Sequence, residues 1–232
     1  NGVNIFTGAG DDQIEVEYTG AANPDTFGVT IDAGTGDDSI TITTFDTSTE
    51  AFAGDLTLNA EDITVDAATN VGGNITFSTA SGTPEENNST ITVNADLTAD
   101  GSVSLTADGV AASSNVGLIN FFTTDTERAS AAVTIADNVT VSGTSVDIDA
   151  RTDVDIDVGS TLILGASVNV TDVTTSTSVT VGSGATISAT AGTVDIDASS
   201  NIDITVSLGL DDSVFWAGGL TGFDVVVSDV DV

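Results

Sequence analysis

Glycine and aspartate recur at a fixed spacing in two short segments near the amino end, in the pattern Gly-x-Gly-x-Asp-x-Ile. Glycine permits the left-handed backbone of a tight turn, and it lets carbonyl oxygens point inward with no side chain in the way. The aspartates add carboxylates, and Ca²⁺ takes about six to eight oxygen ligands from carboxylates and carbonyls. Two such turns, one stacked on the other, would wrap a calcium ion. The candidate metal ligands are Gly8, Gly10, Asp11, Asp12, Gly34, Gly36, Asp37 and Asp38.

The elements that must position these turns are short strands on either side. Alternating or apolar runs at residues 3–6, 13–18, 29–32 and 39–43 predict strands, and the second strand–turn–strand unit repeats the first at a constant offset. The apolar residue after each aspartate, Ile14 or Ile40, is expected to enter the core and anchor the turn. The alternative reading is a Gly-Asp hairpin or a solenoid corner that holds no metal.

The two turns resemble the RTX nonapeptide repeat, Gly-Gly-x-Gly-x-Asp followed by an apolar residue, over residues 7–14 and 33–40. The resemblance implies a calcium-bound parallel β-roll of the kind found in secreted bacterial proteins. Thr7 and Ala33 replace the first glycine of the motif, and the two turns lie farther apart than neighbouring repeats of that family. Binding in this family depends on neighbouring turns, so only a stacked pair of these two turns would make a full site.

From residue 54 the chain consists of short alternating strands separated by Gly, Asn and Asp, such as residues 56–58, 63–65, 75–77 and 91–93. Over roughly residues 54–206 this pattern is similar to the β-helices of filamentous-haemagglutinin-type adhesins. We therefore expect an all-β parallel β-helix, or β-solenoid, with Val and Ile stacking inward and Thr, Ser and Asp outward. With coils of about 20 residues the chain would form a rod on the order of 50 to 60 Å long. Tandem β-sandwich domains remain the alternative.

The sequence suggests three regions: Gly-Asp calcium-binding coils in residues 1–53, solenoid repeats in 54–206, and a carboxyl-terminal cap or subunit contact in 207–232, where Trp216 lies. The strand pattern of residues 133–156 recurs at 179–204 with a nearly constant offset, which indicates a repeat made of two solenoid coils. The segments Ser78–Ser89 and Ala111–Ala131 are irregular and are expected to be loops that leave the stack.

Aspartates also alternate along two later segments. Asp147, Asp149, Asp153, Asp155 and Asp157 surround Arg151, and Asp195, Asp197 and Asp203 recur in the matching places. Alternation puts each series on one face of a strand. Such columns would either bind cations between rungs or form a solvated acidic face that prevents association at strand edges, and the second reading is favoured.

The charge of the chain excludes several classes of partner. It carries 36 acidic and 2 basic residues, for a formal net charge of −34. A chain of this charge repels phosphate backbones and anionic lipid surfaces, so we expect neither nucleic-acid binding nor membrane insertion. The self-repulsion must be offset, and divalent cations or high ionic strength would do so.

The residue types that are missing argue against an enzyme. His, Cys and Lys are absent, which removes Ser-His-Asp triads, thiol nucleophiles, Schiff bases and His-ligated zinc. Polysaccharide lyases on β-helices need a basic residue, and only Arg128 and Arg151 are available. A glycosidase needs two carboxylates, but Trp216 and Tyr18 are single and far apart and make no aromatic platform.

These observations predict a calcium-stabilised, non-catalytic structural or adhesive segment of a large secreted microbial surface protein, extracellular or at the cell surface. Its expected partners are calcium ions and a cell-surface or polysaccharide ligand. The first alternative is a self-assembling subunit of an extracellular filament or sheath, with the carboxyl end as a subunit contact. The second is a carbohydrate-active β-helix enzyme.

Overall fold

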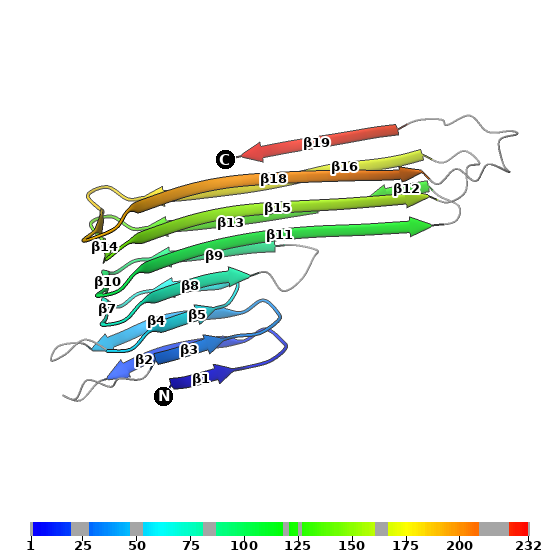
Figure 1. Ribbon diagram of the computed structural model, residues 1–232. Helices are drawn as coiled ribbons and strands as arrows, with labels where there is room; N and C mark the ends of the chain where they lie inside the picture. Colours follow the sequence, from blue (N-terminus) through cyan, green and yellow to red (C-terminus); the bar gives the residue numbers. More distant parts are fainter. Residues whose placement is uncertain are drawn as a thin grey trace, which may run out of the picture.

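The chain winds into a β-solenoid whose coils stack along one axis, with the amino end at the bottom of Figure 1 and the carboxyl end at the top. The computed structural model describes the backbone of residues 2–19, 28–46, 53–80, 87–117, 121–124, 127–160, 167–208 and 223–231. Within these residues the regular structure consists of strands β1 to β19.

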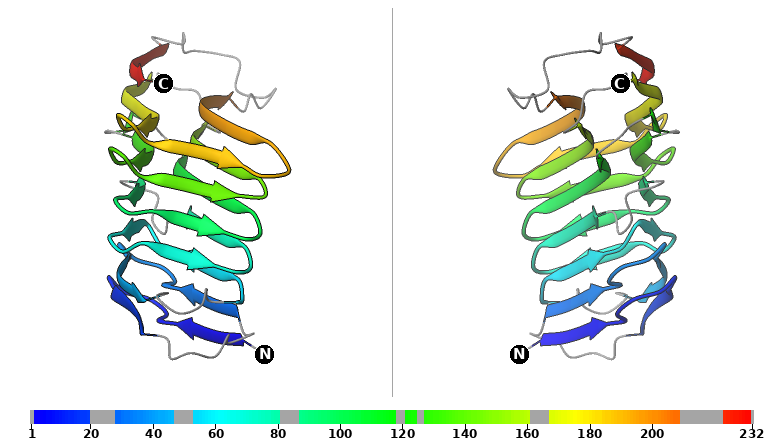
Figure 2. Two further views of the ribbon diagram at one scale, coloured as in Figure 1. Left: turned by 90° about the vertical axis from the view of Figure 1, so that its left-hand side faces the viewer. Right: turned by 90° about the vertical axis from the view of Figure 1, so that its right-hand side faces the viewer.

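The strands form three sheets, which the chain visits in turn (Figures 1 and 2). Sheet I contains β1 (Gly2–Phe6), β3 (Gly28–Asp32), β5 (Leu56–Asn59), β8 (Ile75–Ala80), β11 (Val103–Gly117), β15 (Val146–Ser160) and β18 (Val194–Leu208). Sheet II contains β2 (Gln13–Thr19), β4 (Ser39–Asp46), β6 (Asp62–Val65), β9 (Asn87–Val93), β13 (Glu127–Ile135), β16 (Ser167–Val181), β12 (Phe121–Thr124) and β19 (Phe223–Asp231). Sheet III contains β7 (Thr69–Val71), β10 (Leu97–Ala99), β14 (Thr140–Gly143) and β17 (Thr186–Ala189).

Every strand pair described between these sheet neighbours is parallel, from β1 with β3 to β15 with β18. Parallel strands need a crossover from one strand to the next. Here the described part of each coil supplies it by passing through sheet II and, from β7 onward, through sheet III as well. The predicted parallel β-solenoid is confirmed, and the β-sandwich alternative is wrong because a sandwich is built from antiparallel sheets.

The core consists of aliphatic columns that run through the stack. In sheet II the ladder register places Ile40, Ile63, Ile91 and Val133 one above another, and all four side chains are fully buried. In sheet I a similar buried column consists of Leu58, Phe77, Leu105 and Ile148. β-Branched residues fit this arrangement because their side chains stack well on a pleated surface.

All coils but one are longer than predicted, and the longest lie toward the carboxyl end. Hydrogen bonds join residues 26 and 27 positions apart in the first coils, 19 and 28 in the next ones, and 48 in the last. The predicted coil of about 20 residues holds only between β5 and β8, where this offset is 19. The repeat of residues 133–156 at 179–204 is a single coil and not two, because Val146 pairs directly with Val194 and Val133 with Val179.

The later coils are longer because their strands in sheets I and II extend from 4 residues in β5 and β6 to 15 in β11, β15, β16 and β18. In the extension the two sheets approach closely and the buried side chains are small, such as Ala111 and Ala131. A Cβ on Gly109 would lie 2.5 Å from the carbonyl oxygen of Ser130 in the facing sheet. Among the described residues of this thin part, the buried side chains are no larger than valine.

The interior of the thin part also contains hydroxyl groups that bond to one another. Thr152 Oγ1 lies 2.7 Å from Thr177 Oγ1 and 2.9 Å from Ser200 Oγ, and Ser200 Oγ lies 3.0 Å from Thr175 Oγ1. The three threonines are buried. These bonds connect β15 and β18 in sheet I with β16 in sheet II, so they join the two sheets through polar contacts.

Two of the predicted loops are therefore corrected. Residues 111–131 were expected to leave the stack, but they contain the end of β11, all of β12 and the start of β13. At the two ends of this segment, Ala111 and Ala131 are buried between the sheets. The expected loop at 78–89 is partly strand, since β8 ends at Ala80 and β9 begins at Asn87, and residues 81–86 lie outside the described part. In the carboxyl-terminal region, Trp216 lies outside the described residues, and β19 pairs with β16.

Candidate functional site

The two Gly-Asp turns occupy the same corner of neighbouring coils, where sheet I passes to sheet II. The first joins β1 to β2 and the second joins β3 to β4. Ala9 and Thr35 form a parallel bridge, with Thr35 N donating to Gly8 O and Gly10 N donating to Thr35 O, both at 2.9 Å. The turns thus stack directly, which is the arrangement that a shared site requires.

The glycines are needed for both backbone conformation and space. Gly8, Gly10, Gly34 and Gly36 have φ values of +108°, +121°, +98° and +143°. A Cβ on Gly34 would lie 1.8 Å from Gly8 O, and one on Gly36 would lie 2.3 Å from Gly10 O. The first turn can rest on the second only because these positions carry no side chain.

A column of acidic side chains lies at this corner, one residue before each of the first three strands of sheet II, β2, β4 and β6. Asp38 Oδ1 accepts the backbone N–H of Asp12 at 2.8 Å, and Glu61 Oε2 accepts the backbone N–H of Asp38 at 2.9 Å. Each of these two carboxylates therefore accepts the backbone N–H of the acidic residue in the preceding coil. Asp38 is 1% exposed and Glu61 is 7% exposed, so two carboxylates on adjacent rungs are buried in one column.

The second carboxylate oxygen of Asp38 is the feature that fits a cation. Asp38 Oδ2 is buried and accepts no hydrogen bond from the described residues. A buried carboxylate oxygen without a donor is costly unless a positive charge lies against it. No group of three or more acidic side chains in the described ranges is arranged to hold a metal. A calcium ion here would therefore need carbonyl oxygens of the glycine-rich turns in addition to the carboxylates.

The other predicted aspartates lie nearer to solvent. Asp12 is half-buried, whereas Asp11 and Asp37 are exposed on the outside of the turns. Asp11 Oδ1 accepts the backbone N–H of Asp37 at 3.2 Å, so this carboxylate also links the two coils. All eight predicted residues are thus brought together at one corner, with Asp38 in its interior and Asp11 and Asp37 at its surface.

Sequence reasoning missed Glu61, the third member of the acidic column. Its coil has no glycine at this corner, because only Ala60 and Glu61 separate β5 from β6. The signal was an acidic residue two positions before a core isoleucine, Glu61 before Ile63, as Asp38 stands before Ile40. The Gly-Asp turn is a longer form of the same corner, which in the coil of Glu61 consists of only two residues.

The later aspartate columns form as the spacing predicts. Asp147, Asp149 and Asp155 pair in register with Asp195, Asp197 and Asp203, and all of them except Asp149 are exposed. Asp149 is 4% exposed and forms an ion pair with Arg151.

Asp108 lies directly beside Arg151 on the neighbouring strand β11. Burial raises the pKa of the Asp108 carboxyl, the Arg151 guanidinium lowers it in part, and Asp153 raises it further. The surface around Arg151 is therefore strongly acidic despite the cation at its centre.

The chain was compared with protein-family models, curated proteins and solved structures, and none of them matches it. The described residues contain no helix with the length and apolar character that crossing a membrane requires. Proposals on function therefore rest on the chemistry and geometry of this chain alone.

Proposed function

We propose that the chain is a calcium-stabilised, non-catalytic structural or adhesive segment of a large secreted microbial surface protein. The observation that carries the proposal is the stacked pair of Gly-Asp turns around the buried Oδ2 of Asp38, which accepts no hydrogen bond from the described residues. Calcium would bind among oxygens of these turns and neutralise the acidic column. The RTX-like spacing at residues 7–14 and 33–40 supports the same ion.

The structural part of the proposal follows from the parallel stack. Each coil contacts mainly its neighbours, so the solenoid extends in one direction and holds its outer faces at fixed positions. The non-catalytic part rests on the absence of His, Cys and Lys from the sequence. Calcium sites of extracellular modules bind with dissociation constants of about 10⁻⁴ to 10⁻³ M, which suits a location outside the cell.

An adhesive role is supported by one outer face of sheet II. Five threonines, in register on successive strands, form a column on this face: Thr41, Thr64, Thr92, Thr134 and Thr180. Successive rungs of a sheet are about 4.8 Å apart, so the column presents hydroxyl groups at regular intervals. A flat row of hydroxyl donors and acceptors suits a polysaccharide ligand better than a hydrophobic one.

Calorimetric titration with calcium after chelation, in buffered salt, tests the proposal. One or a few saturable sites are expected, together with a rise in melting temperature. At a calcium concentration about a hundred times the dissociation constant the gain is about 2.7 kcal/mol. For a chain of this size that gain is a shift of roughly 5 to 10 °C.

Magnesium at the same concentration is the control, because it screens the charge of −34 equally but dehydrates reluctantly and fits a carbonyl-rich site poorly. An equal effect of both ions would mean general charge screening and would refute a specific calcium site. No heat and no thermal shift with calcium would refute it as well.

A further inference from the structure

The amino-end face of the solenoid has unpaired strand edges and exposed apolar side chains. Among the described residues β1 pairs only with β3, and β2 pairs only with β4. Val3 and Ile5 of β1 are 43% and 41% exposed, whereas their partners on β3, Val29 and Ile31, pack in or against the core. Phe6, at the end of β1, is 68% exposed. An open edge of this kind is a template for another strand.

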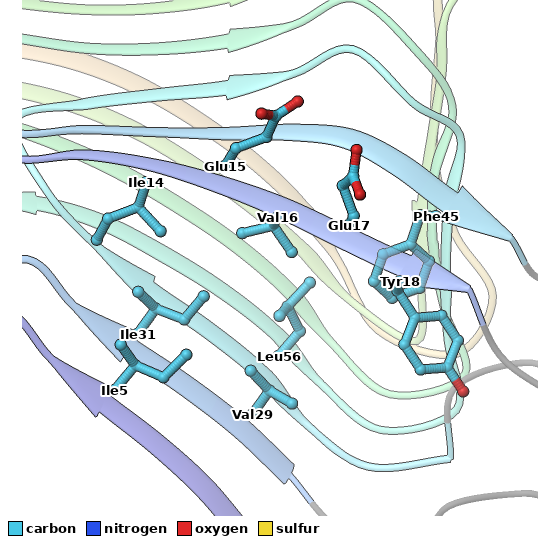
Figure 3. Close-up of a pocket in the computed structure, with 10 residues that line it drawn as sticks. All are labelled: Ile5, Ile14, Glu15, Val16, Glu17, Tyr18, Val29, Ile31, Phe45 and Leu56. Atoms are coloured by element: carbon cyan, nitrogen blue, oxygen red, sulfur yellow. The ribbon is translucent and has the colours of Figure 1, made fainter.

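The interior is also incompletely filled at this end. A cavity of about 220 Å³ lies between the first strands of sheets I and II. Its lining is mainly apolar, and Figure 3 shows the two sheets' side chains facing each other across it while Glu15 and Glu17 point away. Ile5 and Val29 line the cavity from sheet I, and Ile14 and Val16 line it from sheet II.

The acidic column shows what an added coil would meet. Each carboxylate accepts the backbone N–H of the coil before it, Asp38 from Asp12 and Glu61 from Asp38. The backbone bonds run in the opposite direction, since Asp12 O accepts the N–H of Ser39 at 2.8 Å and Asp38 O accepts the N–H of Asp62 at 3.0 Å. Continued by one coil, the pattern places a backbone N–H of the new turn at the Asp12 carboxylate.

The stacked glycines of the two turns, which form a glycine column, also indicate that a further coil fits on the amino-end face. At Gly34 and Gly36 the space that a Cβ would occupy is filled by the carbonyl groups of Gly8 and Gly10. Gly8 and Gly10 have the same left-handed backbone, but a Cβ there would meet nothing within 4 Å. The first turn thus has room for the carbonyls of another turn where the second turn already receives them.

We propose that the amino-end face binds one further parallel coil, a strand–turn–strand segment outside these 232 residues that carries its own Gly-x-Gly-x-Asp turn. The added coil pairs with β1 and β2, covers Val3 and Ile5, and donates a backbone N–H to Asp12. This inference stands on the strand edges and the glycine column, and it does not depend on calcium.

A second copy of this chain is a poorer occupant of the face. Stacked head to tail, the copy would set the 15-residue strand β18 against the 5-residue strand β1, which leaves most of β18 without a partner. Stacked amino end to amino end, the strands would run antiparallel, and the Asp12 carboxylates of both copies would face the same interface. Like charges brought together in this way oppose association.

A tandem duplication tests the proposal. Residues 1–26 are repeated before Asn1, because the first two coils are offset by 26 positions and the new turn then falls in register with Gly8. The control carries the same duplication with the copies of Gly8 and Gly10 changed to Ala, which prevents the new turn from adopting its backbone. Both chains contain the whole original solenoid, so folding of the original part is assayed in each.

The measurement is amide hydrogen exchange of the original β1 and β2 by mass spectrometry, with the copied residues isotopically labelled by segmental ligation so that their peptides differ in mass. Size-exclusion chromatography and light scattering give the oligomeric state. We expect exchange of the original β1 and β2 amides to slow by about tenfold or more in the duplicated chain and not in the control. Unchanged exchange in the duplicated chain would overturn the proposal. Equal protection in the original chain through concentration-dependent dimers would identify a second copy as the occupant and would overturn it too.

Discussion

Replacing Asp38 by Asn separates the role of the buried carboxylate from that of the fold around it. Asn is nearly isosteric, and its Oδ1 can still accept the backbone N–H of Asp12, which Asp38 Oδ1 now accepts at 2.8 Å. The substitution removes the negative charge beside Oδ2, the buried oxygen that accepts no hydrogen bond from the described residues. Without calcium the variant should be more stable than the wild-type chain, and it should lose the response to calcium.

The expected size follows from the acidic column. Asp38 and Glu61 lie on adjacent rungs, whose backbones are about 4.8 Å apart. At an effective dielectric constant of about 20, two like charges at this separation repel by about 3 kcal/mol. In chelator the Asp38→Asn variant should therefore gain about 1 to 3 kcal/mol. In calcium at about a hundredfold excess over the dissociation constant, only the wild-type chain should gain about 2.7 kcal/mol.

Urea unfolding followed by far-ultraviolet circular dichroism measures both free energies, in chelator and in saturating calcium. The Asp100→Asn variant is the matched control, because Asp100 is exposed between β10 and β11 and its replacement removes the same charge. This control should keep the calcium response. The reasoning fails if Asp38→Asn destabilises the chain in chelator, or if its calcium response equals that of the control.

Three further outcomes follow from the described contacts. Gly34→Ala should destabilise the chain more than Gly8→Ala in chemical unfolding. Both substitutions should lower the free energy of unfolding by about 1–2 kcal/mol because of the left-handed backbone, but only the Cβ at position 34 meets a neighbouring carbonyl. Equal losses would mean that the turns do not stack. Thr152→Val should cost about 1–3 kcal/mol by thermal unfolding, since it removes the buried hydroxyl that bonds Thr177; a neutral effect would contradict the hydroxyl contacts. Because burial raises the folded-state pKa of Asp108, stability falls as pH rises from the ordinary pKa of 3.8 through the raised one. The Asp108→Asn variant should thus be more stable than the wild-type chain at neutral pH, and the gain should vanish below pH 3.8.

The parallel solenoid was predictable because alternation of Val, Ile and Leu with polar residues survives in nearly every short strand. The corner residues were also predictable, because glycine and aspartate repeated at a fixed spacing indicate a tight turn with a left-handed backbone. Glu61 was not predicted, because its corner consists of only two residues and contains no glycine. The Gly-Asp motif is therefore absent from the sequence at this corner.

The length of a coil was not predictable from alternation, because one long strand such as β18 and two short strands in succession show the same period. The repeat of residues 133–156 at 179–204 therefore looked like two coils. Residues 111–131 looked irregular because small and polar residues dominate the stretches on either side of the apolar run at 118–122. In the structure, Ala111 and Ala131 are buried between two sheets that approach closely. Only the distance between the sheets, which the sequence does not state, distinguishes such a strand from a loop.

The increase in strand length along the stack has a mechanical consequence. β1 contributes 5 residues to its ladder and β18 contributes 15, so neighbouring coils are held by more backbone hydrogen bonds toward the carboxyl end. In a solenoid each coil is held mainly by its nearest neighbours. A pull along the stack therefore separates the short rungs of the amino-terminal part first, above all those of β5 and β6, while the long rungs between β11, β15 and β18 stay closed.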